Sequence, residues 1–237
     1  MALPKVGYPT YELELPSNGK TIKYRPFIVK EEKVLLLALE SEDEKEVKQA
    51  VKDLIKNCVQ TRIKVEDLPS FDLEYLFMRI RASAVGEIIT LNVTCRDDNK
   101  TQVEVKININ DINVTKPEGH SNKVMLTDTM GIIMKYPSMD RFIETEFLGK
   151  NIKTEEVFEY IAESIDQIFD GEEVWDSSTT SKKEMLEWVE TLTAKQFEAI
   201  QNFYETMPKL EHTFKATNPN TGEVSEYTVE GMQNFFA

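Results

Sequence analysis

The sequence predicts an α+β protein with antiparallel β-hairpins and a mainly helical second half. Two patterns lead to this prediction. In several short runs, apolar and polar residues alternate on either side of Asn, Asp or Gly, as in antiparallel strands joined by tight turns. In other segments, above all after Ser138, apolar residues recur at helical spacing. With 237 residues, of which 41% are hydrophobic, the chain is long enough to bury a sizeable core.

A hairpin is predicted over residues 11–26, because the period of two that is typical of half-buried strands occurs on both sides of a turn. Ser17-Asn18-Gly19 supplies the turn, since Asn and Gly tolerate positive φ. The alternating apolar residues are Tyr11, Leu13, Leu15, Ile22 and Tyr24.

Three helices are predicted next. The apolar run Val34–Leu39 is long enough for a buried helix and too short to span a membrane. A second helix carries an apolar face that includes Cys58, which we expect to be a small buried apolar residue. A third begins at Ser70, whose hydroxyl can cap free N–H groups, with Asp72 at the positive end of the helix dipole. Gly86 is placed to end it.

Alternating apolar residues return in two further hairpins. The first has its turn at Asp97-Asp98-Asn99, and the second has its turn between Asp128 and Gly131. We expect these strands to form one antiparallel sheet of three or four strands. The alternating residues are Ile89, Leu91, Val93, Cys95, Val103, Val105, Ile107, Ile109, Val124, Leu126 and Ile132 to Met134.

From Ser138 onward the pattern is mainly helical. One short helix ends before Gly149. A second is capped by Thr154 and continues to Ile168, and an acidic, hydroxyl-rich connector follows over Asp170–Ser181. The apolar residues expected to face inward in these two helices are Met139, Phe142, Ile143, Phe147, Val157, Phe158, Ile161, Ile165 and Ile168.

Two capping boxes predict the starts of the last two helices, because a Ser or Thr and a Glu or Gln three residues later can bond reciprocally. The pairs are Ser181 with Glu184, and Thr193 with Gln196. A last hairpin has its turn over residues 218–222, and the chain closes with Gly231, Met232, Phe235 and Phe236.

The change of pattern near residue 137 divides the chain into two portions. Residues 1–137 form a β-hairpin and helix portion, and residues 138–237 form a helical portion closed by the C-terminal hairpin. The two portions are either separate domains or layers of one compact domain.

The chain is acidic, with a formal net charge of -14 at pH 7. Such a charge repels nucleic-acid phosphates and anionic membranes, so we expect neither as a partner. It favours solubility and suits a basic protein partner. The first residues lack the apolar stretch of a signal peptide, and the chain has only two cysteines, so we expect a reducing cytoplasm.

The residues show no pattern of a known catalytic or cofactor site, and we expect a non-enzymatic protein without cofactor or metal. The sequence lacks glycine-rich phosphate loops and a Gly-x-Ser-x-Gly elbow. Aligning Asp170-Gly171 with a calcium loop puts Ile168 where an oxygen ligand is needed. A Cys–His pair formed in space stays open, although both cysteines have core-facing periodicity. The histidines are His120, in a predicted loop, and His212, on a predicted strand.

Two turns were compared with a zinc ribbon, which carries a second Cys three positions after the first. After Cys95 that position is Asp98, and the later turn has Asn218 and Asn220 in place of cysteines. Metal binding is therefore not expected, because Asp, Asn and Gly satisfy the geometry of both turns without it.

Aromatic residues crowd the second half of the chain. They are candidates for partner contacts, because aromatic side chains supply much of the hot-spot energy at interfaces. Trp175, within the acidic connector, is the preferred exposed contact residue. The others are Trp188, Phe197, Phe203, Tyr204, Phe235 and Phe236.

Three stretches of the chain resemble a known protein family when they are taken in order. They are residues 3–9 with the hairpin up to Phe27, residues 71–77 with those that follow to Glu87, and residues 210–213 with 229–236. In this order they resemble the baseplate hub assembly protein family of T4-like contractile-tailed bacteriophages. The likeness spans almost the whole chain.

The resemblance implies a non-catalytic role in assembly of the central baseplate hub. The implied partners are other baseplate hub proteins, with the tail tape-measure protein as a further candidate. By this resemblance, the protein is either a permanent component of the virion tail baseplate or a chaperone that acts in the host cytoplasm during assembly. The resemblance also implies paired cysteines at the two turns compared above. This chain keeps only Cys95, so polar turn residues are expected to stand in for a metal-stabilised turn.

Two other functions stay open. An acidic inhibitor that mimics nucleic acid would cluster negative charges on one face and bind a basic nuclease or polymerase. An enzyme without a recognisable motif would have a deep pocket that holds perturbed carboxylates or His212.

Overall fold

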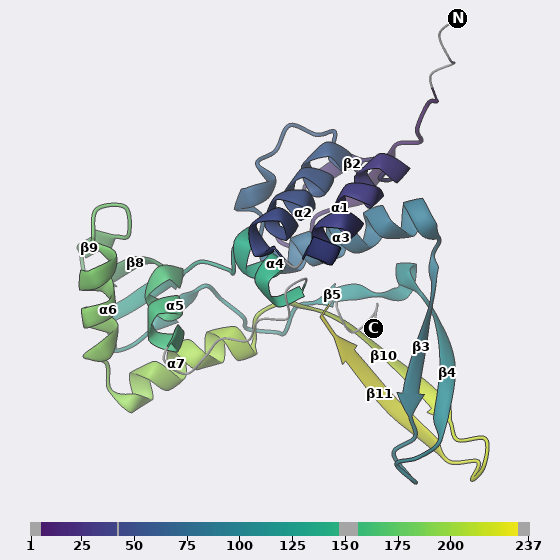
Figure 1. Ribbon diagram of the computed structural model, residues 1–237. Coiled ribbons are helices and arrows are strands. Elements are labelled where there is room, and N and C mark those ends of the chain that lie inside the picture. Colours follow the sequence, from purple (N-terminus) through teal and green to yellow (C-terminus); the bar gives the residue numbers. More distant parts are fainter. Residues whose placement is uncertain (1–5, 42, 147–155, 232–237) are drawn as a thin grey trace, which may run out of the picture. The chain divides into compact units, whose positions relative to one another are not determined.

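The computed structural model describes residues 6–41, 43–146 and 156–231, and it confirms the predicted α+β class. Contacts group the chain into two compact units, which are described separately (Figure 1). The first unit comprises Met1–Thr115, Ser138–Gly149 and Lys209–Ala237, and the second comprises Lys116–Pro137 and Lys150–Pro208. The change of pattern near residue 137 lies at one of the four points where the chain passes between units. The division into residues 1–137 and 138–237 stays a prediction.

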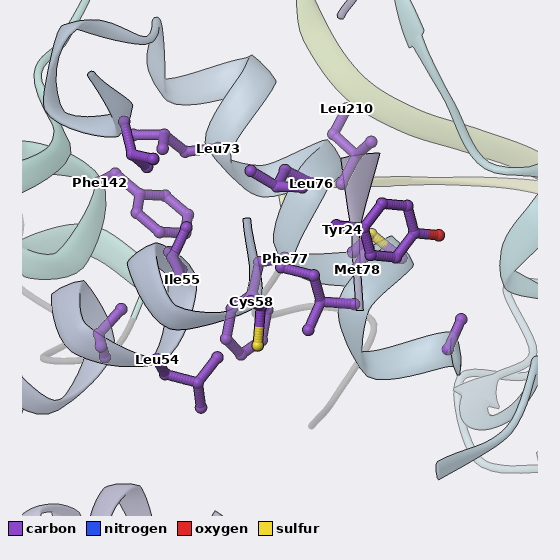
Figure 2. Close-up of a cluster of buried hydrophobic side chains, with 14 of the residues drawn as sticks. Tyr24, Leu54, Ile55, Cys58, Leu73, Leu76, Phe77, Met78, Phe142 and Leu210 are labelled. Carbon is purple, nitrogen blue, oxygen red and sulfur yellow. The ribbon is translucent and has the colours of Figure 1, made fainter. Parts of the chain in front are cut away.

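Helices supply most of the core of the first unit. Their apolar faces meet in one cluster, in which Figure 2 shows Ile55 and Cys58 close to Phe77 and Phe142. Cys58 is fully buried, which confirms that it packs as a small apolar residue. The helices are α1 (Val29–Ser41), α2 (Glu44–Cys58), α3 (Ser70–Val85) and α4 (Met139–Glu146), with short 3₁₀ turns η1 (Val65–Asp67) and η2 (Ile109–Asp111).

The helix α1 forms where it was predicted, but the prediction that its apolar run is buried was wrong. Ala38 is its one buried residue, and Leu35 is partly buried against the core. The apolar residues are distributed around the helix rather than along one stripe. Since α1 packs mainly on α2 along a narrow seam, most of the run stays on the surface.

The two following helices begin with different caps. The Asp43 carboxylate accepts bonds from the backbone N–H groups of Lys45 and Glu46, at 2.8 and 3.3 Å, and so caps α2. Ser70 was wrongly predicted as the cap of α3. Pro69 takes the N-cap position with ψ of 151°, so the cap lies one residue earlier and Ser70 is the buried first residue of the helix. Gly86 ends α3 as predicted, at a φ of 133° that side chains disfavour.

Antiparallel pairs complete the first unit. The predicted first hairpin pairs Leu13 with Ile22, and the C-terminal hairpin pairs Phe214 with Tyr227. The strand β10 also pairs with β5, so the C-terminal hairpin belongs to a three-stranded sheet in the order β11-β10-β5. The strands are β1 (Tyr11–Glu14), β2 (Thr21–Tyr24), β3 (Ile88–Thr94), β4 (Gln102–Asn108), β5 (Asn113–Thr115), β10 (Lys209–Thr217) and β11 (Val224–Glu230).

The second unit combines an antiparallel sheet in the order β6-β7-β8-β9 with helices (Figure 1). Both predicted capping boxes are confirmed, since Ser181 and Glu184, and likewise Thr193 and Gln196, bond reciprocally. The elements are β6 (Lys123–Met125), β7 (Met130–Met134), α5 (Val157–Ser164), β8 (Ile165–Asp170), β9 (Glu173–Asp176), α6 (Lys182–Glu190) and α7 (Ala194–Glu205).

The prediction of a helix continuing to Ile168 was wrong, because the helix stops at Ser164 and β8 follows. Ile133 pairs with Gln167 while Met134 pairs with Ile165, so Asp166 is an extra residue in the ladder. This bulge lets Ile165 and Ile168 both be buried although they are three positions apart. A bulged strand can thus imitate the apolar spacing of a helix.

The prediction of one shared sheet for the two middle hairpins was also wrong. The strands β3 and β4 form a separate two-stranded sheet in the first unit, whereas β6 and β7 belong to the second unit. The alternation of apolar and polar residues specifies which face of a strand is buried, but it does not specify which strand lies next to it in the sheet. The expectations for Phe147, Gly149, Thr154 and for residues 232–236 lie outside the described residues.

A buried arginine connects α3 to the segment that leads into β5. Arg79 is 8% exposed, and its guanidinium donates to the backbone carbonyls of Ile109 and Ile112 at 3.1 and 3.0 Å. It also donates to the Asn110 side chain at 2.7 Å and lies 4.6 Å from the centre of the Tyr75 ring. One side chain therefore bonds to backbone carbonyls in η2 and directly after it, and so connects this segment to α3.

A buried carboxylate holds the first hairpin turn against α3. Asp72 is fully buried and accepts bonds from the backbone N–H of Ser17 at 3.0 Å and from its hydroxyl at 2.5 Å. Burial raises the pKa of Asp72 above its ordinary value, and the two bonds from Ser17 oppose that rise. Asp72 therefore has a tertiary role in addition to its favourable position in the first turn of the helix.

Replacing Asp72 with Ala is expected to destabilise the protein by about 1–3 kcal/mol, because the Ser17 N–H loses its acceptor in a buried place. The free energy of unfolding measured with denaturant checks this. Asp72→Asn is the matched control: it keeps the shape and one acceptor oxygen, so it should cost less than Ala. Equal losses in the two variants would contradict the role given to the hydrogen bonds.

Candidate interaction surfaces

The strand β9 offers an open edge with large apolar side chains. It pairs with β8 and is the terminal strand of its sheet, so along its other edge no strand of the described ranges adjoins it. Val174 is 57% exposed and Trp175 is 43% exposed. The sequence placed Trp175 in a connector, whereas it lies on a strand opposite Ile168. Its role as a partner contact stays a prediction.

The hairpin that carries β9 was missed in the sequence, although its turn left a signal. Gly171 has a φ of 60°, and Asp170 pairs with Glu173 across the turn. An Asp-Gly pair between apolar runs is a common sign of a tight hairpin. Acidic residues dominate the segment, and for this reason its composition indicates a connector rather than a strand.

Carboxylates flank the apolar residues of β9. Glu172 and Glu173 are exposed. Asp176 accepts a bond from the backbone N–H of Ser178 at 2.8 Å, and bonds from Ser178 and Gln167 lower the pKa of Asp176 to about 2. At neutral pH this edge is therefore apolar at Val174 and Trp175 and negatively charged beside them, which suits a partner with apolar and basic residues.

A second apolar surface lies on α1, which we call the α1 face. Two exposed charged residues, Lys33 and Glu40, stand among its apolar residues. Such a concentration of large apolar side chains on one exposed helix typically marks a binding site. The apolar residues of the α1 face are Val29, Val34, Leu36, Leu37 and Leu39, which are 38–80% exposed.

An ion pair fixes the start of α1. The Arg25 guanidinium donates two bonds to the Glu31 carboxylate, at 2.7 and 2.9 Å, and the backbone N–H of Ile28 donates to the same carboxylate at 2.9 Å. The bonds from Arg25 lower the pKa of Glu31. Glu31 therefore faces β2 and its following loop, and the α1 face is presented on an anchored helix.

The two turns compared with a zinc ribbon meet in space. The side-chain amide of Asn218, which is 2% exposed, donates to both Asp97 carboxylate oxygens at 3.0 Å and to Asp98 at 3.1 Å. The Thr221 hydroxyl donates to Asp97 at 2.6 Å. Polar side chains therefore connect the tip of the β3–β4 hairpin to the tip of the β10–β11 hairpin.

The two turns also share one backbone geometry. The N–H of Asn99 donates to the carbonyl of Cys95, and the N–H of Gly222 donates to the carbonyl of Asn218, at 2.9 and 2.8 Å. Asn99 and Gly222 both have positive φ, at 52° and 77°. In a zinc ribbon, two facing turns of the same form supply the ligands of the metal ion. In this protein, side-chain hydrogen bonds connect the two turns.

Residues 8–237 match the family described as T4 bacteriophage base plate protein. The chain belongs to this family. Among curated proteins and solved structures, no significant match was found. Membership confirms the predicted likeness to T4-like baseplate proteins and gives the chain a structural role in the phage base plate.

Both cysteines of this base plate protein are buried. Burial raises the pKa of the Cys58 thiol to about 12, and it also raises that of Cys95. His120 contacts the Thr206 hydroxyl at 3.0 Å and the Tyr136 hydroxyl at 2.9 Å, and burial lowers its pKa. His212 lies on β10, as predicted.

A hollow of about 200 Å³ next to the first hairpin turn is smaller than typical ligand pockets, and Glu14 is the one carboxylate that lines it. Within the described ranges, no group of three or more His, Cys, Asp and Glu residues could hold a metal ion. None of the helices described is long and apolar enough to cross a membrane.

Replacing Asn218 with Ala should lower the free energy of unfolding by about 1–2 kcal/mol, because its buried NH2 group donates to carboxylate oxygens of Asp97 and Asp98. Asn220→Ala is the matched control, since Asn220 is exposed and its side chain donates one bond, to Thr101. Amide hydrogen exchange should speed up at both hairpin tips in Asn218→Ala. An effect no larger than that of Asn220→Ala would contradict the role of Asn218.

The pH dependence of this connection has a defined sign. Bonds from Asn218 and Thr221 lower the pKa of Asp97 from 3.8, and bonds from Thr101 lower that of Asp98. A carboxylate with a lowered pKa stabilises the folded state above its ordinary pKa, and this contribution is lost as the pH falls below it. Wild-type protein should therefore lose more stability than Asn218→Ala when the pH is lowered from about 5 to about 3. Parallel pH dependence in the two proteins would contradict this account.

Cys58 is expected to resist alkylation in the folded protein, because the thiolate is the reactive species and burial disfavours it. Mass spectrometry after treatment with iodoacetamide at about pH 8, near the ordinary pKa of a thiol, should find Cys58 unmodified in native buffer and fully modified in denaturant. Rapid native labelling of Cys58 would contradict the assigned burial.

Proposed function

We propose that this base plate protein takes part in assembly of the central baseplate hub by binding other hub proteins. The observation that carries the proposal is the open edge of β9, where Val174 and Trp175 remain exposed beside unpaired backbone groups. A structural role in the base plate requires protein partners, and this edge combines two means of binding them.

The first means is strand addition. An extended segment of a partner can pair with the free backbone groups of β9 and so lengthen the sheet. The second is apolar burial, since Trp175 supplies a large rigid surface that commonly anchors interfaces. Backbone pairing would give affinity, while the pocket that receives Trp175 would give specificity.

Charge narrows the choice of partner. The chain has a formal net charge of -14, and exposed Glu172 and Glu173 stand next to the apolar residues of β9. A hub protein with a basic, apolar segment fits this edge, because opposite charges speed association and exclude acidic partners. The tail tape-measure protein is the further candidate partner.

The proposal is tested by a pull-down of the tagged chain from phage-infected cells, together with mass spectrometry of purified mature virions. Recovery of hub proteins would support the assembly role. Presence in virions would make the chain a permanent component, and its absence from virions would make it a transient chaperone in the host cytoplasm. Recovery of host nucleases or polymerases alone would favour the acidic inhibitor instead.

Replacing Trp175 with Ala should weaken recovery of the hub partner about tenfold or more, because truncating an aromatic anchor at an interface typically has an effect of this size. The melting temperature should change little, since the side chain is 43% exposed. Affinity is measured with the recovered partner, and stability is measured by thermal unfolding.

Trp188→Ala is the matched control, since Trp188 is partly buried against the core of the second unit. That variant should lower the melting temperature. Unchanged partner binding by Trp175→Ala would remove Trp175 from the interface, and a large fall in its melting temperature would show that it is part of the core.

A further inference from the structure

The α1 face has a pattern that is complementary to itself. Lys33, Leu36, Leu37 and Glu40 occupy positions i, i+3, i+4 and i+7 of the helix, so they form one continuous patch. All four are exposed. In the patch, a cation lies toward one end, an anion lies toward the other, and two leucines lie between them.

Antiparallel pairing of two such helices would match every member of the patch. We place the two-fold axis midway between Leu36 and Leu37. Each residue of one helix then faces the residue of the second copy that lies equally far from the axis in the opposite direction along the sequence. Leu36 then meets Leu37 of the second copy, and Lys33 meets Glu40 of the second copy. A two-fold interface uses the same patch on both subunits, so it requires this kind of symmetry.

We propose that the α1 face binds the α1 face of a second copy of this chain, in antiparallel orientation, so that the protein forms a two-fold dimer. Val34 and Leu39 lie on the two flanks of the helix, outside this patch. This surface lies in the first unit and is separate from β9, so the inference does not depend on the proposed function.

The charged residues of α1 favour a second copy of this chain as the partner over an unrelated protein. Glu31, which would place a second anion near Lys33, is already bonded to Arg25 at 2.7 Å. Within the part of the chain that the structure describes, neither Lys33 nor Glu40 forms an ion pair. Each is thus available to the opposite charge that a second copy brings.

The size of the patch indicates the strength of the contact. A helix of 13 residues is about 20 Å long. One pair of such helices buries less than the roughly 1,200–2,000 Å² of a standard stable interface. The dimer should therefore be weak, with a dissociation constant on the order of micromolar, and reversible on dilution.

Sedimentation velocity of the purified full chain over a concentration series tests the proposal. Lys33→Glu should weaken self-association about tenfold, because it places a carboxylate against that of Glu40 of the second copy at both ends of the patch. Glu40→Lys should weaken it equally, since two ammonium groups then face each other. The double variant, Lys33→Glu with Glu40→Lys, restores opposite charges across the axis and should recover wild-type association.

Two controls carry the same changes in net charge away from α1. Lys106→Glu and Glu104→Lys alter exposed residues of β4 and should leave association unchanged. Circular dichroism confirms that each variant is folded. A wild-type chain that stays monomeric up to about 100 µM, well above a micromolar dissociation constant, would overturn the proposal. Failure of the double variant to recover association would overturn it as well.

Discussion

The first unit depends on the hydrogen bonds of one buried arginine. Arg79 can leave water because its donors meet the backbone carbonyls of Ile109 in η2 and of Ile112 directly after it. By fixing η2, it fixes the start of β5, with which β10 pairs. The strand β10 in turn carries β11 and the turn at Asn218 that reaches Asp97. A chain of contacts thus connects the helical core to the most distant hairpin tips of the same unit.

The candidate surfaces differ from this core in the kind of residue they expose. In the core of the first unit, the buried carboxylate of Asp72 finds partners in the N–H and hydroxyl of Ser17. On α1 and β9, large apolar groups remain in contact with water, which is unfavourable for an isolated protein and favourable for one that is to be assembled. A base plate protein with such exposed surfaces must avoid aggregating before it meets its partners, and the high negative charge of the chain opposes aggregation.

The sequence predicted most elements of the fold, because short-range signals such as capping boxes, turn residues and alternation act locally. The capping box at Ser181 and the stop at Gly86 were found for this reason. The predictions that were wrong concerned features that depend on contacts between residues distant in sequence. The bulge at Asp166 imitated helical spacing, and the exposure of Leu36 could not be inferred, since an apolar run predicts a buried helix only if another element covers it. Trp175 was singled out as a contact residue for its type and charged surroundings, while the strand that carries it was missed.

The division of the units along the chain has a consequence for synthesis. Residues of the first unit come from three separate segments, the last of which begins at Lys209. Its sheet therefore cannot be completed until the residues of β10 have left the ribosome, whereas the second unit is fully synthesised by Pro208. The nascent chain must hold α3, which contacts β10 in the folded unit, without that strand for much of its elongation. Completion of the first unit is thus tied to late translation, so a chain that terminates before Lys209 would lack β10 and β11 of that unit.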